Sequence, residues 1–191
     1  MAFLHRLALF LADNVGSLVT ARRISDYLKS QKVKVSHNLV IDYLSYLSNA
    51  FLVLRAGRYD IAGKKIFEIG EKYYFEDLGI RHALVGFRVT DMHKILENIV
   101  FMHLRASGYD VAVGRLDKQE VDFVCEKAGE RLYVQAAYLI ADDKVRHREF
   151  GNLMKIKDNF PKMVVSMDEV TSATYKGIQH LYLEDFLLSS L

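Results

Sequence analysis

Two short stretches in the second half of the chain decide its fold: Glu120-Val121-Asp122-Phe123-Val124 and Tyr133-Val134-Gln135-Ala136-Ala137. Both are rich in the β-branched and aromatic residues that favour strands, and the turn residues Ala128-Gly129 lie between them. They predict two neighbouring strands of one sheet, and these strands carry the polar side chains of Asp122 and Gln135.

The segments on either side predict a mixed sheet with flanking helices. A helix is expected from Asp91 to about Ser107, ended by Gly108, because apolar residues recur there at helical spacing. The remaining expected elements are a strand at Tyr109–Leu116, a helix at Lys144–Lys157, a strand at Lys162–Met167 and a final strand-and-helix piece at Ile178–Leu188. Helix, three strands, helix and strand is the order of a restriction-endonuclease-like core.

Three polar side chains of this half have the pattern of a metal-dependent phosphodiesterase. Glu97 lies on the expected helix, Asp122 on one strand and Gln135 on the next. Strand alternation places Glu120 and Asp122 on one face of the sheet, and Val121 with Phe123 on the other. Such a site would hold one or two magnesium ions through its oxygen ligands, with a lysine supporting the attacking water.

The lysine that this chemistry needs is missing, because Ala137 occupies its position two residues after Gln135. Loss of a positioned charged group typically costs on the order of 10²–10⁴ in rate. Lys118, Lys144 and Arg148 lie on neighbouring segments and are candidates for a relocated cation. We therefore expect a degenerate, non-cleaving site, with Glu97, Asp122 and Gln135 as metal ligands only in the alternative of an active endonuclease.

The first half of the chain predicts a winged helix. Helices are expected at residues 5–14, at Ala21–Ser30 behind Thr20, and at His37–Ala50 behind Ser36. A strand at Phe51–Ala56, a turn that includes Arg58 and Asp60, and a strand at Lys65–Phe75 follow. A short helix begun by Asp77 would join the halves. We predict a winged-helix domain at 1–88 and a nuclease-like domain at 89–191, in a mixed α+β or α/β fold.

Exposed cations and polar groups in that first half are candidates for DNA contact. The third helix would enter a major groove and the hairpin would be the wing. The candidates for base and phosphate contacts are Lys32, Lys34, Ser36, His37, Asn38, Arg55, Arg58, Lys64 and Lys65. The rest of the third helix offers no Lys or Arg, so a structural or dimerisation role stays open beside DNA binding.

Composition limits the class of protein. Residues 1–90 carry 13 Lys and Arg against 8 Asp and Glu, a balance of +5, and residues 91–191 carry 13 against 16, a balance of −3. This asymmetry suggests two modules with different partners. No apolar run approaches the roughly 20 residues of a membrane span, and no signal-peptide layout is present. The single cysteine, Cys125, indicates a core residue in a reducing, cytoplasmic compartment.

Several phrases resemble the C-terminal region of prokaryotic AAA-type ATP-binding proteins. They are Arg58–Lys65, Glu71–Gly79, Leu96-Glu97-Asn98, Glu120–Phe123 and Val134–Tyr138. In that family the region combines a winged helix with a PD-(D/E)XK-like fold and is catalogued as a domain of unknown function. Other members often keep the lysine of the third motif, where this chain has Gln135-Ala136-Ala137. The resemblance implies an ATPase domain that normally precedes this segment, and with it ATP, which nothing in this chain would bind.

Three functions are therefore in competition. The leading expectation is a non-catalytic module that binds DNA or a partner on behalf of an ATPase. The second is a magnesium- or manganese-dependent nuclease with a relocated lysine. The third is a purely structural module that docks the ATPase domain. The expected partners are DNA, an ATPase domain and a second copy of the chain, with no membrane and no cofactor of its own.

Overall fold

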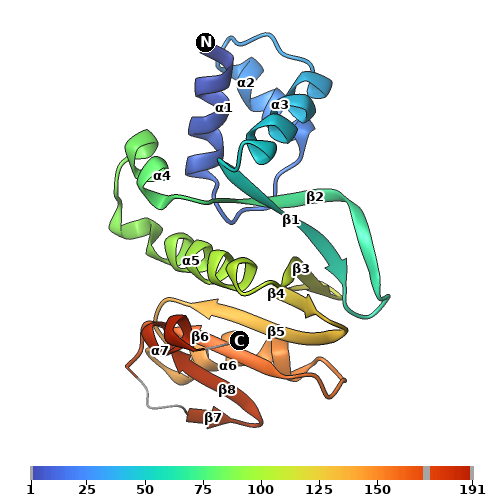
Figure 1. Cartoon of the computed structure of the whole chain (residues 1–191), viewed down its shortest axis with the longest axis vertical. Helices are drawn as coiled ribbons and strands as arrows, with labels where there is room; N and C mark the ends of the chain where they lie inside the picture. Colours follow the sequence, from blue (N-terminus) through green and yellow to red (C-terminus); the bar gives the residue numbers. More distant parts are fainter. Residues whose placement is uncertain (1, 170–172, 190–191) are drawn as a thin grey trace. The chain divides into compact units, whose positions relative to one another are not determined.

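The structure is a computed structural model that describes residues 2–169 and 173–189 (Figure 1). The chain divides into two compact units. The front unit contains the residues up to Ala56 together with Ile69–Asp91, and the back unit contains Gly57–Glu68 together with the residues from Met92 onward. The segment 57–68 is the tip of a hairpin, so the chain passes into the back unit and returns before it finally enters at Met92.

The front unit begins with three helices: α1 (Ala2–Asp13), α2 (Ala21–Ser30) and α3 (His37–Asn49). The predicted caps are confirmed, since the side chain of Thr20 accepts from the backbone N–H of Arg23 and that of Ser36 accepts from Leu39. Between α1 and α2, Val19 forms an antiparallel bridge to Glu71 of the hairpin. This bridge ties the connection between the first two helices to a strand that is fifty residues further along the chain.

The hairpin consists of β1 (Val53–Asp60) and β2 (Lys65–Phe75). The predicted second strand is confirmed, but the first is longer than predicted. Arg58 and Asp60 belong to β1 and not to the turn, because residues 58–60 pair with a third strand that local sequence does not reveal. Tyr73 and Tyr74 are buried in the core of the front unit. The helix α4 (Leu78–Val85), capped by Asp77, follows.

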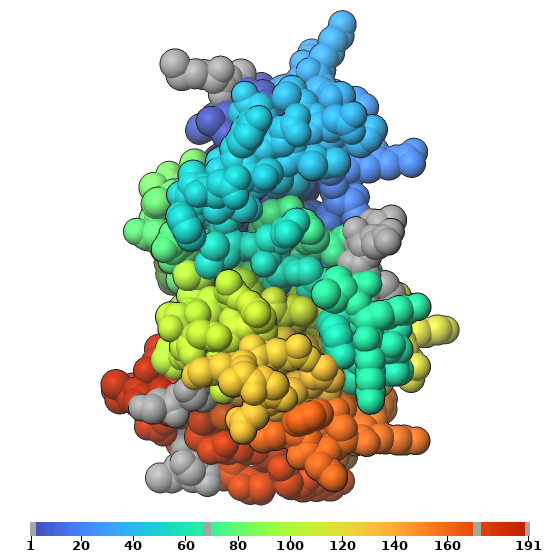
Figure 2. Space-filling view, turned by 45° about the vertical axis from the view of Figure 1, so that its right-hand side comes forward, coloured from blue at the N-terminus to red at the C-terminus, as the bar shows by residue number. Residues whose placement is uncertain are grey.

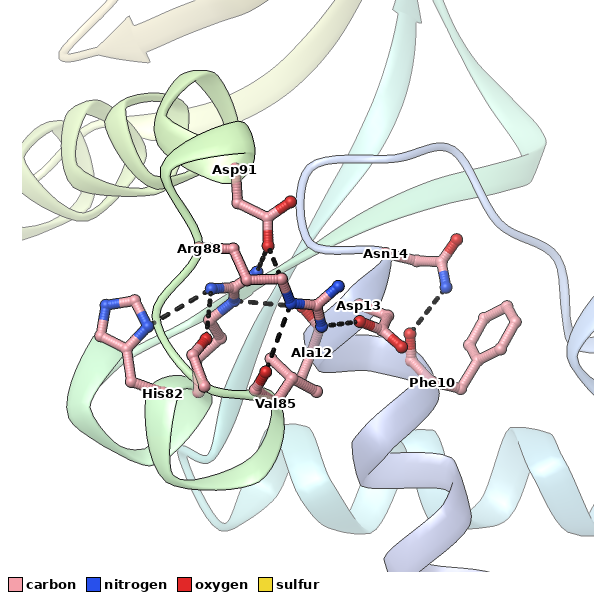
Figure 3. Close-up of polar contacts among 10 residues, drawn as sticks. Phe10, Ala12, Asp13, Asn14, His82, Val85, Arg88 and Asp91 are labelled. Atoms are coloured by element: carbon pink, nitrogen blue, oxygen red, sulfur yellow. Dashed lines mark hydrogen bonds and ion pairs between the residues drawn. The ribbon is translucent and has the colours of Figure 1, made fainter.

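Ion pairs stabilise the end of the front unit, where Arg88 lies between Asp13 and Asp91 (Figure 3). Arg81 of α4 is fully buried, donates to the carbonyl of Ala12 at 3.2 Å and forms an ion pair with Asp91. Arg88 forms a second ion pair with Asp13. These contacts link α1, α4 and the short 3₁₀ helix Val89–Asp91, with which the front unit ends.

The back unit is a mixed sheet with helices on both faces. After α5 (Met92–Ala106), the strands are β3 (Asp110–Leu116), β4 (Gln119–Lys127), β5 (Glu130–Ala137), β6 (Lys162–Ser166), β7 (Ala173–Tyr175) and β8 (Ile178–Tyr182). Their order is β3-β4-β5-β6-β8-β7, and β1 pairs in parallel with β3 through residues 58–60. The antiparallel pairs β3/β4 and β4/β5 join parallel pairs β5/β6 and β6/β8. The mixed α/β architecture with flanking helices is as predicted.

Helices α5 and α6 (Asp143–Met154) cover opposite faces of this sheet (Figure 1). Phe123 of β4 packs its ring against Phe101 of α5, whereas the next residue, Val124, belongs to the apolar cluster that includes Phe150 of α6. Consecutive strand residues point to opposite faces, so the two helices lie on different sides. The last helix, α7 (Leu183–Leu188), contacts α5 through the rings of Phe186 and His103.

One strand of the back unit was not predicted. β7 has only three residues and pairs antiparallel with β8 through a tight turn at Lys176-Gly177, both with positive φ. A strand of three residues is too short to show an apolar alternation that could be recognised in the sequence. β7 lies at the edge of the sheet and pairs with a single strand, β8.

Candidate functional site

The strand that carries Asp122 contains an irregularity at that residue. Ala112 of β3 lies opposite Val124, but Gly114 lies opposite Val121, so β4 has one more residue than β3 over this stretch. Val121 and Val124 consequently both enter the apolar cluster beneath α6, while Phe123 faces α5. The predicted alternation, with Val121 and Phe123 on one face, is therefore wrong. A β-bulge shifts the register by one residue and so changes the face of every side chain beyond it.

Asp122 and Gln135 are adjacent, as predicted for neighbouring strands. The regular pairing of β4 with β5 ends at Phe123 and Val134. Beyond it, the backbone N–H of Asp122 donates to the amide oxygen of Gln135 at 3.3 Å, and the N–H of Ala136 donates to the carboxylate of Asp122 at 2.9 Å. Both residues are buried. Hydrogen bonds from these two side chains thus take the place of the backbone–backbone hydrogen bonds that are lost where the strands separate.

A buried acid on α6 completes this cluster, and it was missed in the sequence. The amide nitrogen of Gln135 donates to Glu149 at 3.3 Å, and the guanidinium of Arg148 binds the other oxygen of that carboxylate at 2.7 Å. Glu149 is only 8% exposed. The available signal was its position four residues before Leu153, which places both on the apolar side of the helix. The signal is weak, since acids at helix borders are common.

The predicted metal ligands include Glu97, which lies half-buried on α5. It belongs to the helix opposite the one that carries Glu149, because α5 and α6 cover different faces. Within residues 2–169 and 173–189, no group of three or more His, Cys, Asp or Glu side chains is close enough together to hold a metal ion. Of the three predicted ligands, Asp122 and Gln135 are in direct contact.

The position of the missing lysine is part of the core. Ala137 is 5% exposed and packs in the cluster that contains Phe150 and Leu153 of α6. Of the three candidate replacements, Lys118 and Lys144 are exposed, in the β3–β4 turn and the first turn of α6. Arg148 is the one whose contacts reach the cluster, through Glu149 to Gln135.

The candidate DNA contacts fall into two groups. Lys32, Lys34, His37 and Asn38 are all exposed in the front unit, and no ion pair involves Lys32 or Lys34 among the described residues. Figure 2 shows side chains projecting into solvent from the blue segment that includes α2 and the turn after it. Ser36 is also exposed but uses its hydroxyl oxygen to accept from Leu39.

The wing candidates are divided between the two units. Arg55 belongs to the front unit and forms an ion pair with Glu71 at 3.3 Å. Arg58, Lys64 and Lys65 belong to the hairpin tip, which is part of the back unit. The two lysines are exposed and Arg58 is half-buried. Of the DNA-contact candidates, the front unit therefore contains Arg55 and the contiguous group Lys32–Asn38, but not the hairpin-tip residues.

A buried serine and histidine in the back unit form a structural network. Ser166 lies 2.8 Å from Nε2 of His180 and donates to Asp168 at 2.9 Å. The carboxylate touches the serine and not the histidine, and Ser166 is fully buried. Burial lowers the pKa of His180, with Arg146 contributing in the same direction and Asp168 opposing. The arrangement joins β6 to β8 and lacks the order of a catalytic triad.

Comparisons with known proteins identify a family model and relatives of this chain. The model of a domain of unknown function, DUF8612, matches residues 2–91, the stretch that ends where the front unit ends. An "Uncharacterized protein" of Haemophilus influenzae is 41% identical over 185 residues, which are 97% of this chain and 46% of that protein. The "Uncharacterized protein MJ1544" of Methanocaldococcus jannaschii is 27% identical over 124 residues, 63% of this chain and 27% of that protein.

The chain therefore spans less than half the length of these two relatives. No solved structure matches it. In residues 2–169 and 173–189, none of the helices combines the length and the apolar character that a membrane crossing requires.

Proposed function

We propose that the chain is a non-cleaving nucleic-acid-binding module, in which the front unit contacts DNA. The observation that carries this proposal is the exposed group Lys32, Lys34, His37 and Asn38. From residue 21 to residue 38 the sequence has five Lys and Arg against one Asp. A segment in which cations outnumber acids in this way is the electrostatic footprint of phosphate binding.

The arrangement of the front unit supports a winged-helix assignment. Three helices precede a hairpin, and the connection between the first two helices bridges to the second hairpin strand through Val19 and Glu71. That order places α3 and its first turn at the surface next to Lys32 and Lys34. Winged helices contact nucleic acid with the corresponding helix and the turn before it, and in this chain the cations lie in that turn and not on α3.

The contacts of the back unit support the absence of cleavage. The amide oxygen of Gln135 accepts from the backbone N–H of Asp122, and the Asp122 carboxylate accepts from that of Ala136. Glu149 is neutralised by Arg148. Ala137 occupies the lysine position in a packed core. A divalent cation would have to displace these contacts before it could be held by the same oxygens.

We further propose that the module belongs to a longer ATPase. The family resemblance implies such a domain, and the Haemophilus influenzae relative has more than half of its length outside the match. Purified full-length relative is expected to hydrolyse ATP, whereas this chain is not. ATP hydrolysis by neither protein would contradict the assignment.

The direct test is fluorescence anisotropy of labelled DNA in EDTA, titrated with salt. Binding is expected to weaken linearly in log salt, and the Lys32→Gln/Lys34→Gln variant should reduce the slope by about two contacts, roughly 0.9 each for duplex DNA. Lys155→Gln/Lys157→Gln is the matched control, with two lysines at the same spacing, both exposed in the back unit. Flat anisotropy at low salt, or equal losses in both variants, would contradict the proposal.

The second candidate function is a nuclease in which Arg148 replaces the lysine. The chain of contacts from Arg148 through Glu149 to Gln135 favours it, because it brings a cation to the third motif. It predicts manganese-dependent nicking of plasmid DNA that is lost in Glu97→Ala, Asp122→Ala and Arg148→Ala but kept in Lys144→Ala. Nicking that survives the first two changes would identify a contaminating nuclease.

A further inference from the structure

The residue that ends α3 has an unfavourable backbone conformation. Phe51 has φ 56°, in the left-handed region, and its N–H donates to Ser48 at 3.1 Å while the next N–H donates to Leu47 at 3.0 Å. Helices usually use glycine at this position, because a side chain there crowds the backbone. A bulky aromatic residue is among the least suited to it.

Packing does not compensate for this conformation, because the Phe51 side chain is 64% exposed. Lys32 has a similar backbone conformation at the end of α2, but its ammonium group is well solvated. An exposed phenyl ring gains nothing from water. Both the backbone conformation and the solvent exposure of Phe51 are therefore unfavourable in the isolated protein. This suggests that its ring is useful when a ligand is bound.

The outer face of α3 is unsuited to a duplex groove. Its centre is formed by Asn38, Asp42, Ser45 and Asn49, all exposed. No Lys or Arg occurs between Val35 and Leu54. A helix in the major groove lies between two rows of phosphates, where the carboxylate of Asp42 would be repelled and no cation on this helix would offset the repulsion.

Aromatic rings border this face instead. Tyr46 is 60% exposed, and its ring lies 5.7 Å from that of Tyr43, which in turn lies 4.8 Å from Phe3 of α1. The row therefore consists of two half-buried rings, Phe3 and Tyr43, and ends in the exposed ring of Tyr46. Tyr46 on α3 and Phe51 just after it, five residues further on, each present an exposed ring on which an unpaired base could stack. Stacking on such rings tolerates any base, because every base has a π face.

We propose that the ligand of the front unit is single-stranded nucleic acid, with bases stacked on Tyr46 and Phe51 and phosphates bound by Lys32 and Lys34. This inference rests on the proposed function and names its substrate class. The charge balance favours a polyanion over an apolar protein partner, since five cations and one acid occupy residues 21–38. Cations along the backbone and rings beneath the bases are the two parts of sequence-independent single-strand sites.

The test compares a labelled single-stranded oligothymidine with a duplex of the same length at low salt. The full chain is expected to bind the single strand at least tenfold more tightly. Tyr46→Leu and Phe51→Leu should each weaken that binding by about 5- to 150-fold, because they remove stacking but keep apolar volume. Phe87→Leu is the matched control: Phe87 is also a front-unit ring, 61% exposed, but it lies after α4 and should leave binding unchanged.

A stability measurement makes the test independent of misfolding. Phe51→Gly is expected to raise the urea midpoint, because glycine adopts the left-handed conformation freely, while it weakens single-strand binding as Phe51→Leu does. A variant that is more stable but binds less tightly cannot owe its defect to unfolding. Unchanged binding in Phe51→Gly would overturn the inference.

The failures of the two proposals are distinguishable. Equal affinity for single strand and duplex, with loss only in Lys32→Gln/Lys34→Gln, would keep the proposed function and overturn the stacking surface. No binding of either nucleic acid would overturn both. Concentration-dependent self-association in sedimentation, abolished by Phe51→Gly, would assign the rings to a protein interface and also overturn the inference.

Discussion

Arg81 is the residue on which the end of the front unit depends most. Its guanidinium is fully buried and donates to two backbone carbonyls, those of Ala12 and Gly86, at 3.2 and 3.4 Å. The ion pair with Asp91 supplies the negative charge that makes this burial tolerable. A buried ion pair contributes little compared with apolar packing, but removing one partner leaves the other uncompensated.

We expect Arg81→Ala to destabilise the protein by about 3–5 kcal/mol, because the buried Asp91 carboxylate would lose Arg81 and keep the longer contact with Arg88 at 3.8 Å. Urea denaturation followed by circular dichroism measures the change. Arg105→Ala is the comparison, since Arg105 pairs with the exposed Asp110 at the surface and should shift the midpoint far less. Equal shifts in both variants would contradict the role of burial.

Cys125 illustrates how burial determines reactivity. It is fully buried in β4, and burial raises the pKa of its thiol well above the usual range. The thiolate is the reactive form. In the folded protein, Cys125 is therefore expected to resist a disulfide reagent such as DTNB at pH 8, and to react completely in 8 M urea. Rapid reaction in the native state would show that the strand opens to solvent.

At the scale of elements, the bulge in β4 requires a neighbour without a side chain. Gly114 of β3 lies beside it, and a Cβ at this position would meet Val124 Cγ2 at 2.8 Å and Val121 Cβ at 3.0 Å. Val121 Cβ is attached directly to the backbone and cannot rotate away. The bulge therefore depends on the glycine at position 114. It lies beside Asp122, where the regular pairing of β4 with β5 has ended.

Gly114→Ala is expected to destabilise the protein by about 1–3 kcal/mol through overpacking. Gly151→Ala in α6 is the matched control, because a Cβ there meets no atom within 4 Å and alanine favours helix over glycine by about 1 kcal/mol. The two variants should move the urea midpoint in opposite directions. A stabilising Gly114→Ala would show that β4 readjusts without cost.

At the scale of the whole molecule, two histidines of the back unit link stability to pH. Burial lowers the pKa of His103, whose Nε2 is buried without a hydrogen-bond partner among the described residues. Burial likewise lowers the pKa of His180. Both residues therefore take up protons more readily in the unfolded chain, which has the ordinary pKa near 6.5.

Stability is consequently expected to decrease as the pH falls below about 6.5, because the unfolded state then binds more protons than the folded state. The loss should level off once the pH has fallen below the folded pKa values. Urea midpoints at pH 7.5 and pH 5.0 measure it, and His103→Leu should reduce the dependence. A midpoint that rises on acidification over this range would contradict the lowered pKa values.

Local sequence determined most of the elements of this protein. Thr20, Ser36 and Asp77 begin helices where their side chains were expected to cap them, and β2 has the predicted bounds. Caps and apolar periodicity act over a few residues, so they can be read without knowing what packs against them. The exposure of Lys32, Lys34, His37 and Asn38 follows from the same local signals.

Tertiary structure alone decided which unit the hairpin tip joins and which side chains of different elements meet. The hairpin tip belongs to the back unit because residues 58–60 pair with β3, more than fifty positions away. The face of Val121 depends on a bulge that arises from pairing with β3, and Glu149 joins Gln135 only because α6 folds back over β5. Strand register and helix placement are set by long-range packing, and a one-residue shift leaves the local pattern intact while it changes which side chains meet.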